Sequence, residues 1–188
     1  MRPLALLAAV FALQAASVVP QESRLDLQHI ISDDTALGSV ELLYSVEGQL
    51  VALHGDGRVL MQSTNKQLSL LPTCKGKVAP ADIRRLVETM LAAQFLDLPQ
   101  KSYMMINPDA EDWRKLQLHS ISIKATGGSA KRGFAAGEYG GEHQELPEKF
   151  ATVEKAIVEL KSKTIPPGTH CTVAPPLWSE DKSVPTVR

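Results

Sequence analysis

The chain has 188 residues with 20 basic and 21 acidic side chains, so its formal net charge is −1. Nucleic-acid-binding proteins usually carry a basic excess, and peripheral membrane proteins a polybasic cluster or an amphipathic anchor; the sequence has none of these, so no nucleic-acid partner is expected. Aromatic residues make up only 5% of the chain, which argues mildly against surfaces that stack on sugars or single-stranded bases.

Residues 1–17 have the three-part layout of a secretory signal peptide. Arg2 supplies a positive charge, an apolar run covers residues 4–16, and small residues precede a cleavage point after Ser17. The run is shorter than the roughly 20 apolar residues that cross a bilayer, and no cysteine follows it to take a lipid. We therefore expect a mature protein that begins near Val18, is periplasmic or secreted, and keeps no membrane anchor.

The segment after the signal peptide, residues 18–37, has only isolated apolar side chains and is expected to be a weakly structured lead-in. Short apolar runs bounded by turn signals then predict strands over residues 39–46, 50–54, 58–62 and 68–71. Gly55-Asp56-Gly57 joins two of these runs, which is typical of a β-hairpin. Pro72 is expected to stop the last strand of this group.

Apolar residues at helical spacing predict a helix over residues 80–93, with Pro80 in its first turn. Strands are predicted over residues 116–123 and 131–136, with a phase slip at His119-Ser120 that suggests a bulge. A second amphipathic helix is expected over residues 147–163. Its predicted apolar face holds Phe150, Val153, Ile157 and Leu160; its predicted water-facing side holds Glu154, Lys155, Glu159 and Lys161.

Hairpins that alternate with amphipathic helices predict an α+β fold, in which an antiparallel sheet built from β-hairpins has two amphipathic helices packed on one face. A parallel sheet is disfavoured because parallel neighbours need a crossover connection. We expect a single domain over residues 38–164, followed by a Pro-rich tail over residues 165–188 that Cys171 and Trp178 fasten to the domain.

Cys74 and Cys171 are the two cysteines of the chain. In an oxidising compartment an even number of cysteines favours disulfides, so we expect them to pair; free thiols or a bridge to another chain are the alternatives. Closing a loop of about 97 residues stabilises a fold by roughly 4–5 kcal/mol in the chain-entropy model. His170 beside Cys171 is not expected to form a catalytic pair, because catalytic Cys and His are normally distant in sequence.

Several features follow one another over about residues 38–163: the hairpin of residues 53–59, a helix that leads to Phe95 and Leu98, Tyr103, the strand of residues 118–124 with a glycine-turned partner, and a helix introduced by Leu146-Pro147. In this order they resemble a family of secreted bacterial domains of unknown function, built from two hairpin-plus-helix units. The resemblance implies an α+β fold and a location outside the cytoplasm. It implies no catalytic residues.

The five histidines prompt a search for a metal site. His54 and Asp56 flank the first hairpin tip, and Glu138, Glu142 and His143 share a glycine-rich segment. If both segments lie at the same end of the sheet, they form the mixed His–carboxylate set that zinc accepts. No two histidines have the helical spacing of a metalloprotease. We therefore expect no metal and no cofactor, and the alternative is a site at these residues.

Other motifs have simpler interpretations. Gly55-Asp56-Gly57 lacks the ligand spacing of a calcium loop and is typical of a turn. Residues 137–141 lack the Lys-Ser/Thr of a phosphate-binding loop and are predicted to be a mobile loop. Gly127-Gly128-Ser129 is a turn, not a nucleophile elbow. The acidic residues 109–113 are either an exposed connector or a surface for a basic partner.

Because no catalytic motif is found, we expect an exported, non-catalytic binding or interaction domain with a protein partner. Two alternatives stay open. One is a metal-dependent or other hydrolase with a site assembled from His54, Glu138 and His143. The other is a small-ligand carrier that uses the sheet face opposite the helices.

Overall fold

The computed structural model describes residues 25–63, 71–100, 116–139, 141–166, 168–175 and 177. Several predictions fall outside these residues: the signal peptide, the start of the mature chain, the acidic residues 109–113, Tyr103 and Trp178. Within the described residues, no helix is long and apolar enough to cross a membrane.

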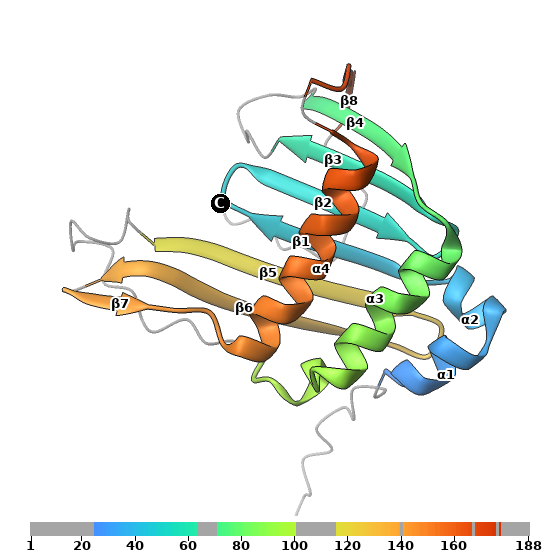
Figure 1. Ribbon diagram of the computed structural model, residues 1–188, viewed down its shortest axis with the longest axis horizontal. Coiled ribbons are helices and arrows are strands. Elements are labelled where there is room, and N and C mark those ends of the chain that lie inside the picture. Colours follow the sequence, from blue (N-terminus) through green and yellow to red (C-terminus); the bar gives the residue numbers. More distant parts are fainter. Residues whose placement is uncertain are drawn as a thin grey trace, which may run out of the picture.

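Eight strands form one antiparallel sheet in the order β7-β6-β5-β1-β2-β3-β4-β8 (Figure 1). The strands are β1 (Glu41–Val46), β2 (Gln49–His54), β3 (Arg58–Ser63), β4 (Leu71–Lys77), β5 (Leu116–Ala125), β6 (Gly128–Tyr139), β7 (Glu142–Gln144) and β8 (Thr172–Ala174). The helices are α1 (Leu27–Ser32), α2 (Asp34–Gly38), α3 (Pro80–Ala92), the short 3-10 helix η1 (Phe95–Asp97) and α4 (Glu148–Thr164). The predicted α+β class and the antiparallel, hairpin-built sheet are confirmed.

The segment predicted to be a weakly structured lead-in contains α1 and α2. Asp26 caps α1, because its Oδ1 accepts hydrogen bonds from two backbone N–H groups of the first turn, and Asp33 caps α2 in the same way. The buried residues of the segment are Leu25, Leu27, Ile30, Ala36 and Leu37. The isolated apolar side chains of this segment therefore belong to the core, and two capping aspartates make its short helices possible.

Two strand predictions are also corrected. Pro72 does not end a strand, since β4 runs on to Lys77. Pro72 lies at the start of β4 and pairs with Val173 of β8, while the pairing of β4 with β3 begins at Thr73; near the end of a strand proline is tolerated because few ladder bonds need its missing N–H. Residues 137–139 are not loop but extend β6 and pair with β7.

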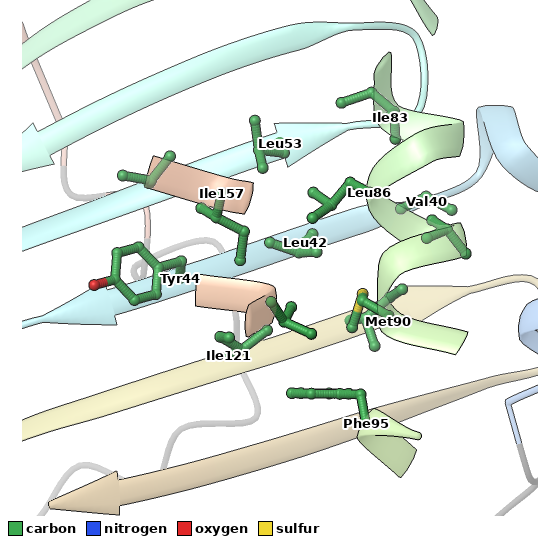
Figure 2. Packing of buried hydrophobic residues seen from close by; sticks show 14 of the residues in the cluster. Val40, Leu42, Tyr44, Leu53, Ile83, Leu86, Met90, Phe95, Ile121 and Ile157 are labelled. Carbon is green, nitrogen blue, oxygen red and sulfur yellow. The ribbon is translucent and has the colours of Figure 1, made fainter. Parts of the chain in front are cut away.

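The core lies where apolar residues of neighbouring strands share one face. Leu42 pairs with both Leu53 and Ile123, and Leu53 pairs with Val59, so these four side chains point to the same side, and all are buried. In α3 and α4 the buried residues are Ile83, Leu86, Val87, Met90, Phe150, Val153 and Ile157. Figure 2 shows side chains of α3, α4, β1, β2 and β5 meeting in this cluster.

α3 and α4 contact each other and run side by side across the sheet in Figure 1. α3 begins at Pro80, and Asp82 accepts the backbone N–H of Ala79, which satisfies one exposed donor at this end. α4 approaches β4 so closely at its end that a Cβ on Gly76 would lie 2.2 Å from the Cγ2 of Thr164. The helix therefore depends on a glycine in β4 for its position.

The hairpin tip Gly55-Asp56-Gly57 is fixed by neighbouring backbone. A Cβ on Gly55 would lie 1.7 Å from the carbonyl oxygen of Leu37, and one on Gly57 would lie 2.1 Å from that of Val78. Gly57 also has φ of +87°, which favours glycine. Its carbonyl accepts the N–H of Val78 at 2.9 Å. The glycines thus allow close packing of the hairpin against α2 and the β4–α3 junction.

The end of the described chain is fastened to the sheet in two ways. Cys74 of β4 and Cys171 form a disulfide, as predicted, and the next residues pair with β4 as β8. The side chain of Gln62, only 1% exposed, donates to the oxygens of Thr73 (2.8 Å) and Pro175 (2.9 Å) and accepts the N–H of Leu177 at 2.8 Å. The predicted extended tail is therefore in part a strand.

Candidate functional site

The structure separates the two halves of the predicted metal site. His54 pairs with Glu41, Glu41 with Lys124 of β5, and Lys124 with Ser129 of β6. Glu138 lies nine residues beyond Ser129 on β6, which is roughly 30 Å along an extended strand. His54 therefore lies toward one end of the sheet and Glu138 toward the other, so the structure does not assemble the predicted hydrolase site.

Each half has local contacts of its own. Asp56 accepts the backbone N–H of Arg58 at 3.0 Å and pairs with its guanidinium at 2.7 Å; the backbone hydrogen bond and this pairing lower the pKa of Asp56. Glu138 and His143 lie opposite each other on β6 and β7. In the described part of the chain, no three or more His, Cys, Asp or Glu residues gather where they could hold a metal ion.

A different set of polar residues meets at the border of the core. The hydroxyl of Tyr44 in β1 donates a hydrogen bond to Oε1 of Glu154 in α4 at 2.5 Å, and Nδ1 of His119 in β5 lies 2.5 Å from the same oxygen. Tyr44 is buried, and the side chains of His119 and Glu154 are 12% and 14% exposed. We refer to these three residues as the Tyr44–Glu154–His119 cluster.

Strand register and helix periodicity bring the three residues together. Tyr44 pairs with Ile121, and His119 lies two residues before Ile121, so both ring side chains point to the same face of the sheet. Glu154 lies four residues after Phe150 and three before Ile157, both fully buried, which places it along the buried side of α4. Figure 2 shows the hydroxyl of Tyr44 pointing away from the labelled apolar side chains.

The hydrogen bonds of the cluster set its charges. Burial raises the pKa of Glu154, but the hydrogen bonds from His119 and Tyr44, together with the charge of His119, outweigh it and lower this pKa below its ordinary value. Burial raises the pKa of Tyr44, and the hydrogen bond to Glu154 raises it further. Glu154 is therefore an ionised acceptor at neutral pH, and both neighbours donate to it, so His119 carries a proton on Nδ1.

Two polar atoms of the cluster stay open. Neither Oε2 of Glu154 nor Nε2 of His119 has a protein partner among the described residues, and neither is sealed from solvent. With Nδ1 protonated, Nε2 of His119 accepts a hydrogen bond when the imidazole is neutral and donates one when it is an imidazolium. The arrangement can accept hydrogen bonds from a ligand. Tyr44 is not an activated nucleophile, because its raised pKa keeps the hydroxyl protonated.

The sequence interpretation missed this cluster in two places. Glu154 was predicted to face water, and the phase slip at His119-Ser120 was predicted to be a bulge. The pairing of β5 with β6 is uninterrupted from Leu116 to Ala125. The alternation breaks because Leu118 points outward and is 49% exposed, while His119 takes a core-facing position. The feature of the sequence that indicates this site is a polar histidine at a strand position whose side chain faces the core.

Away from the cluster, described residues also line hollows. One of about 380 Å³ lies between α1 and the end of α3, next to Leu27 and Met90. Another of about 280 Å³ lies beside the disulfide at the end of α4, and its strand residues Gln49, Met61 and Cys74 share the sheet face of Tyr44. Neither hollow lies on the opposite sheet face, where the small-ligand carrier would bind.

Comparison with known proteins adds no family. No protein-family model matches the sequence, and no curated protein is significantly similar to it.

Proposed function

We propose that this protein is an exported, non-catalytic binding domain, periplasmic or secreted, that recognises a protein partner through the Tyr44–Glu154–His119 cluster. The observation that carries the proposal is the pair of open polar atoms, Oε2 of Glu154 and Nε2 of His119, on side chains that internal hydrogen bonds already hold in place. A site ordered before binding loses little conformational entropy when the partner arrives. Binding is favoured over catalysis because, among the described residues, no serine, threonine or cysteine side chain is hydrogen-bonded to His119 to serve as its nucleophile.

The location outside the cytoplasm is supported by the Cys74–Cys171 disulfide, since such bonds persist in oxidising compartments and are rare in reducing ones. The signal-like layout of residues 1–17 supports the same location. Export brings the domain into contact with partners at the cell surface or in the surrounding medium.

We further propose that α3 and α4 pack on one face of the sheet and that the cluster lies at the edge of α4. This arrangement is supported by the contacts of α4 with Tyr44, His119 and Gln49, because the strand register places these three side chains on the same face. In Figure 1 the β6–β7 hairpin and the adjoining ends of β5 and β6 extend beyond α4. A partner would approach Glu154 and His119 from this side.

The test is crosslinking of the exported protein in its native surroundings, followed by mass spectrometry. Wild type is compared with Glu154→Gln and with a matched control, Glu159→Gln, which removes an exposed carboxylate of the same helix. We expect a protein that wild type and the control capture and that Glu154→Gln loses. Equal capture by all three, or a bound small molecule that survives Glu154→Gln, would contradict a partner site at the cluster.

A further inference from the structure

We propose that residues 178–188 lie across the sheet face opposite to Leu42 and Tyr44, with Trp178 packed against apolar residues of β1, β2 and β3. We call this face the second face. Because strand side chains alternate, the residues of β1, β2 and β3 that point to it include Leu43, Leu50, Ala52, Leu60 and Gln62. The Tyr44–Glu154–His119 cluster lies on the other face, so this inference does not rest on the proposed function.

Part of the second face is buried. Leu50 is 8% exposed and Ala52 is 4% exposed. Both stand outside the hydrophobic cluster that side chains of the strands form with α3 and α4. Within the described residues, the sheet side chains that α4 hydrogen-bonds, those of Tyr44, His119 and Gln49, all belong to the other face. Apolar side chains lose contact with water only where other atoms cover them, which points to a segment of the chain that lies over Leu50 and Ala52.

The described end of the chain already crosses the edge of this face. β8 pairs with β4 along the edge of the sheet and ends at Ala174. The side chain of Gln62 in β3 then donates to the carbonyl oxygen of Pro175 at 2.9 Å and accepts the N–H of Leu177 at 2.8 Å. Between Ala174 and Leu177 the chain therefore passes from the sheet edge, over β4, to β3. The next strand in this direction is β2, which carries the two buried residues.

The rest of the chain is long enough to cover the centre of the second face. Eleven residues, 178–188, follow Leu177. An extended chain advances about 3.3 Å per residue, so this segment can reach roughly 36 Å. Neighbouring strands lie about 4.8 Å apart, so crossing β2, β1 and β5 takes roughly 15 Å. The segment can therefore cover these three strands even if it is not fully extended.

Trp178 follows Leu177 directly and suits this surface. A tryptophan side chain buries about 150–250 Å² when it packs against a protein surface. By register Ala52 lies between Leu43 of β1 and Leu60 of β3, and both leucines are half-buried. A flat ring that packs over the small residue contacts both leucines. The sheet face that a small ligand would use is then closed by the chain's own C-terminal segment.

The two tryptophans of the chain, Trp113 and Trp178, allow a test in the full-length exported protein. Trp113→Phe leaves Trp178 as the only indole fluorophore. We expect it to emit at a shorter wavelength than N-acetyltryptophan amide and to be quenched several-fold less by acrylamide, because the ring is shielded from water. Leu60→Gln, added to this variant, should shift both the emission and the quenching toward those of the free amide.

Leu118→Gln is the matched control, because Leu118 points to the same face from β5 but is 49% exposed. It should leave the emission of Trp178 unchanged. Leu43→Gln repeats the test from the other side of Ala52 if Leu60→Gln does not fold, and circular dichroism shows which variants are folded.

Trp178→Phe supplies the opposite reporter, Trp113. If Leu60→Gln changed the emission of Trp113 and not that of Trp178, residues 101–115 would cover the second face and the proposal would be wrong. A Trp178 quenched as strongly as the free amide, or one whose emission no folded variant at Leu60 or Leu43 changes, would also overturn it. None of these outcomes depends on Glu154, so they leave the partner capture through the cluster untouched.

Discussion

The carboxylate of Glu154 joins α4 to two strands through one oxygen atom. Its Oε1 accepts from Tyr44 of β1 and lies in hydrogen-bond contact with His119 of β5. Removing the carboxylate would leave two partly buried donors without a partner, and an unsatisfied buried polar group costs about 1–3 kcal/mol. The same residue is therefore expected to affect both stability and binding.

The pH dependence of stability tests the electrostatics at this residue. Since the pKa of Glu154 is lowered in the folded protein, the stability it adds is fully present above the ordinary carboxyl pKa of about 4.3. It is lost as the pH falls through the lower folded-state pKa. We expect the difference in unfolding free energy between wild type and Glu154→Gln to be largest near neutrality and to shrink on acidification below about pH 4.3.

Urea unfolding followed by circular dichroism at a series of pH values measures this difference. Glu159→Gln serves as the control and should track wild type, because its carboxylate is exposed. If the gap between wild type and Glu154→Gln stayed constant down to strongly acidic pH, the assigned lowering of the Glu154 pKa would be wrong.

Among the elements, the hairpin between β2 and β3 depends on close backbone approach at its tip. Gly55→Ala would place a Cβ 1.7 Å from the carbonyl oxygen of Leu37, so either α2 or the hairpin must move. We expect a loss of about 2 kcal/mol or more in unfolding free energy. Gly38→Ala is the matched control, because nothing lies within 4 Å of its Cβ position. Thermal unfolding measures the stability of both variants, and equal midpoints would contradict this close approach of Gly55 to Leu37.

The C-terminal strand β8 depends on a side chain of β3. Gln62→Ala removes hydrogen bonds to Thr73, Pro175 and Leu177, and the backbone groups of the last two then lose a buried partner. We expect faster amide hydrogen exchange at Leu177 and a global loss of about 1–3 kcal/mol. Gln117→Ala, at an exposed position of β5, should leave exchange at Leu177 unchanged.

The sequence predicts an element well when the residues that determine it lie close together in the chain. The helices near residues 80–93 and 147–163 were placed within about two residues, because apolar spacing and proline positions are local signals. The cluster was missed because Glu154 looks like any polar residue of an amphipathic helix. The partners of Glu154 can be identified only from the pairing of β1 with β5, two strands that lie far apart in the sequence. This pairing places Tyr44 and His119 on the same face of the sheet.

For the whole molecule, the disulfide joins positions 97 residues apart in sequence, so it restricts most of the unfolded chain. In the chain-entropy model a loop of this length adds about 4–5 kcal/mol. We expect a reductant to lower the urea midpoint of wild type by a corresponding amount. The double variant Cys74→Ala, Cys171→Ala should unfold at the lower midpoint with or without the reductant. A wild type whose midpoint is unchanged after both thiols are shown to be free would contradict the prediction.

The pairing of β1 with β5 has a consequence for the rate at which the chain folds. The pairs β1–β2, β2–β3, β3–β4, β5–β6 and β6–β7 each join consecutive strands, whereas β1 and β5 come from distant parts of the sequence. Distant pairing needs a costly loop closure, so the two groups of hairpins should form before they dock. We call the pairing of β1 with β5 the seam between the two groups. Ile123→Val, at the seam position that pairs with Leu42, should then mainly accelerate unfolding. Val51→Ala, in the β1–β2 hairpin, should mainly slow refolding. Stopped-flow rates at matched stability distinguish this order of assembly from one in which the seam forms first.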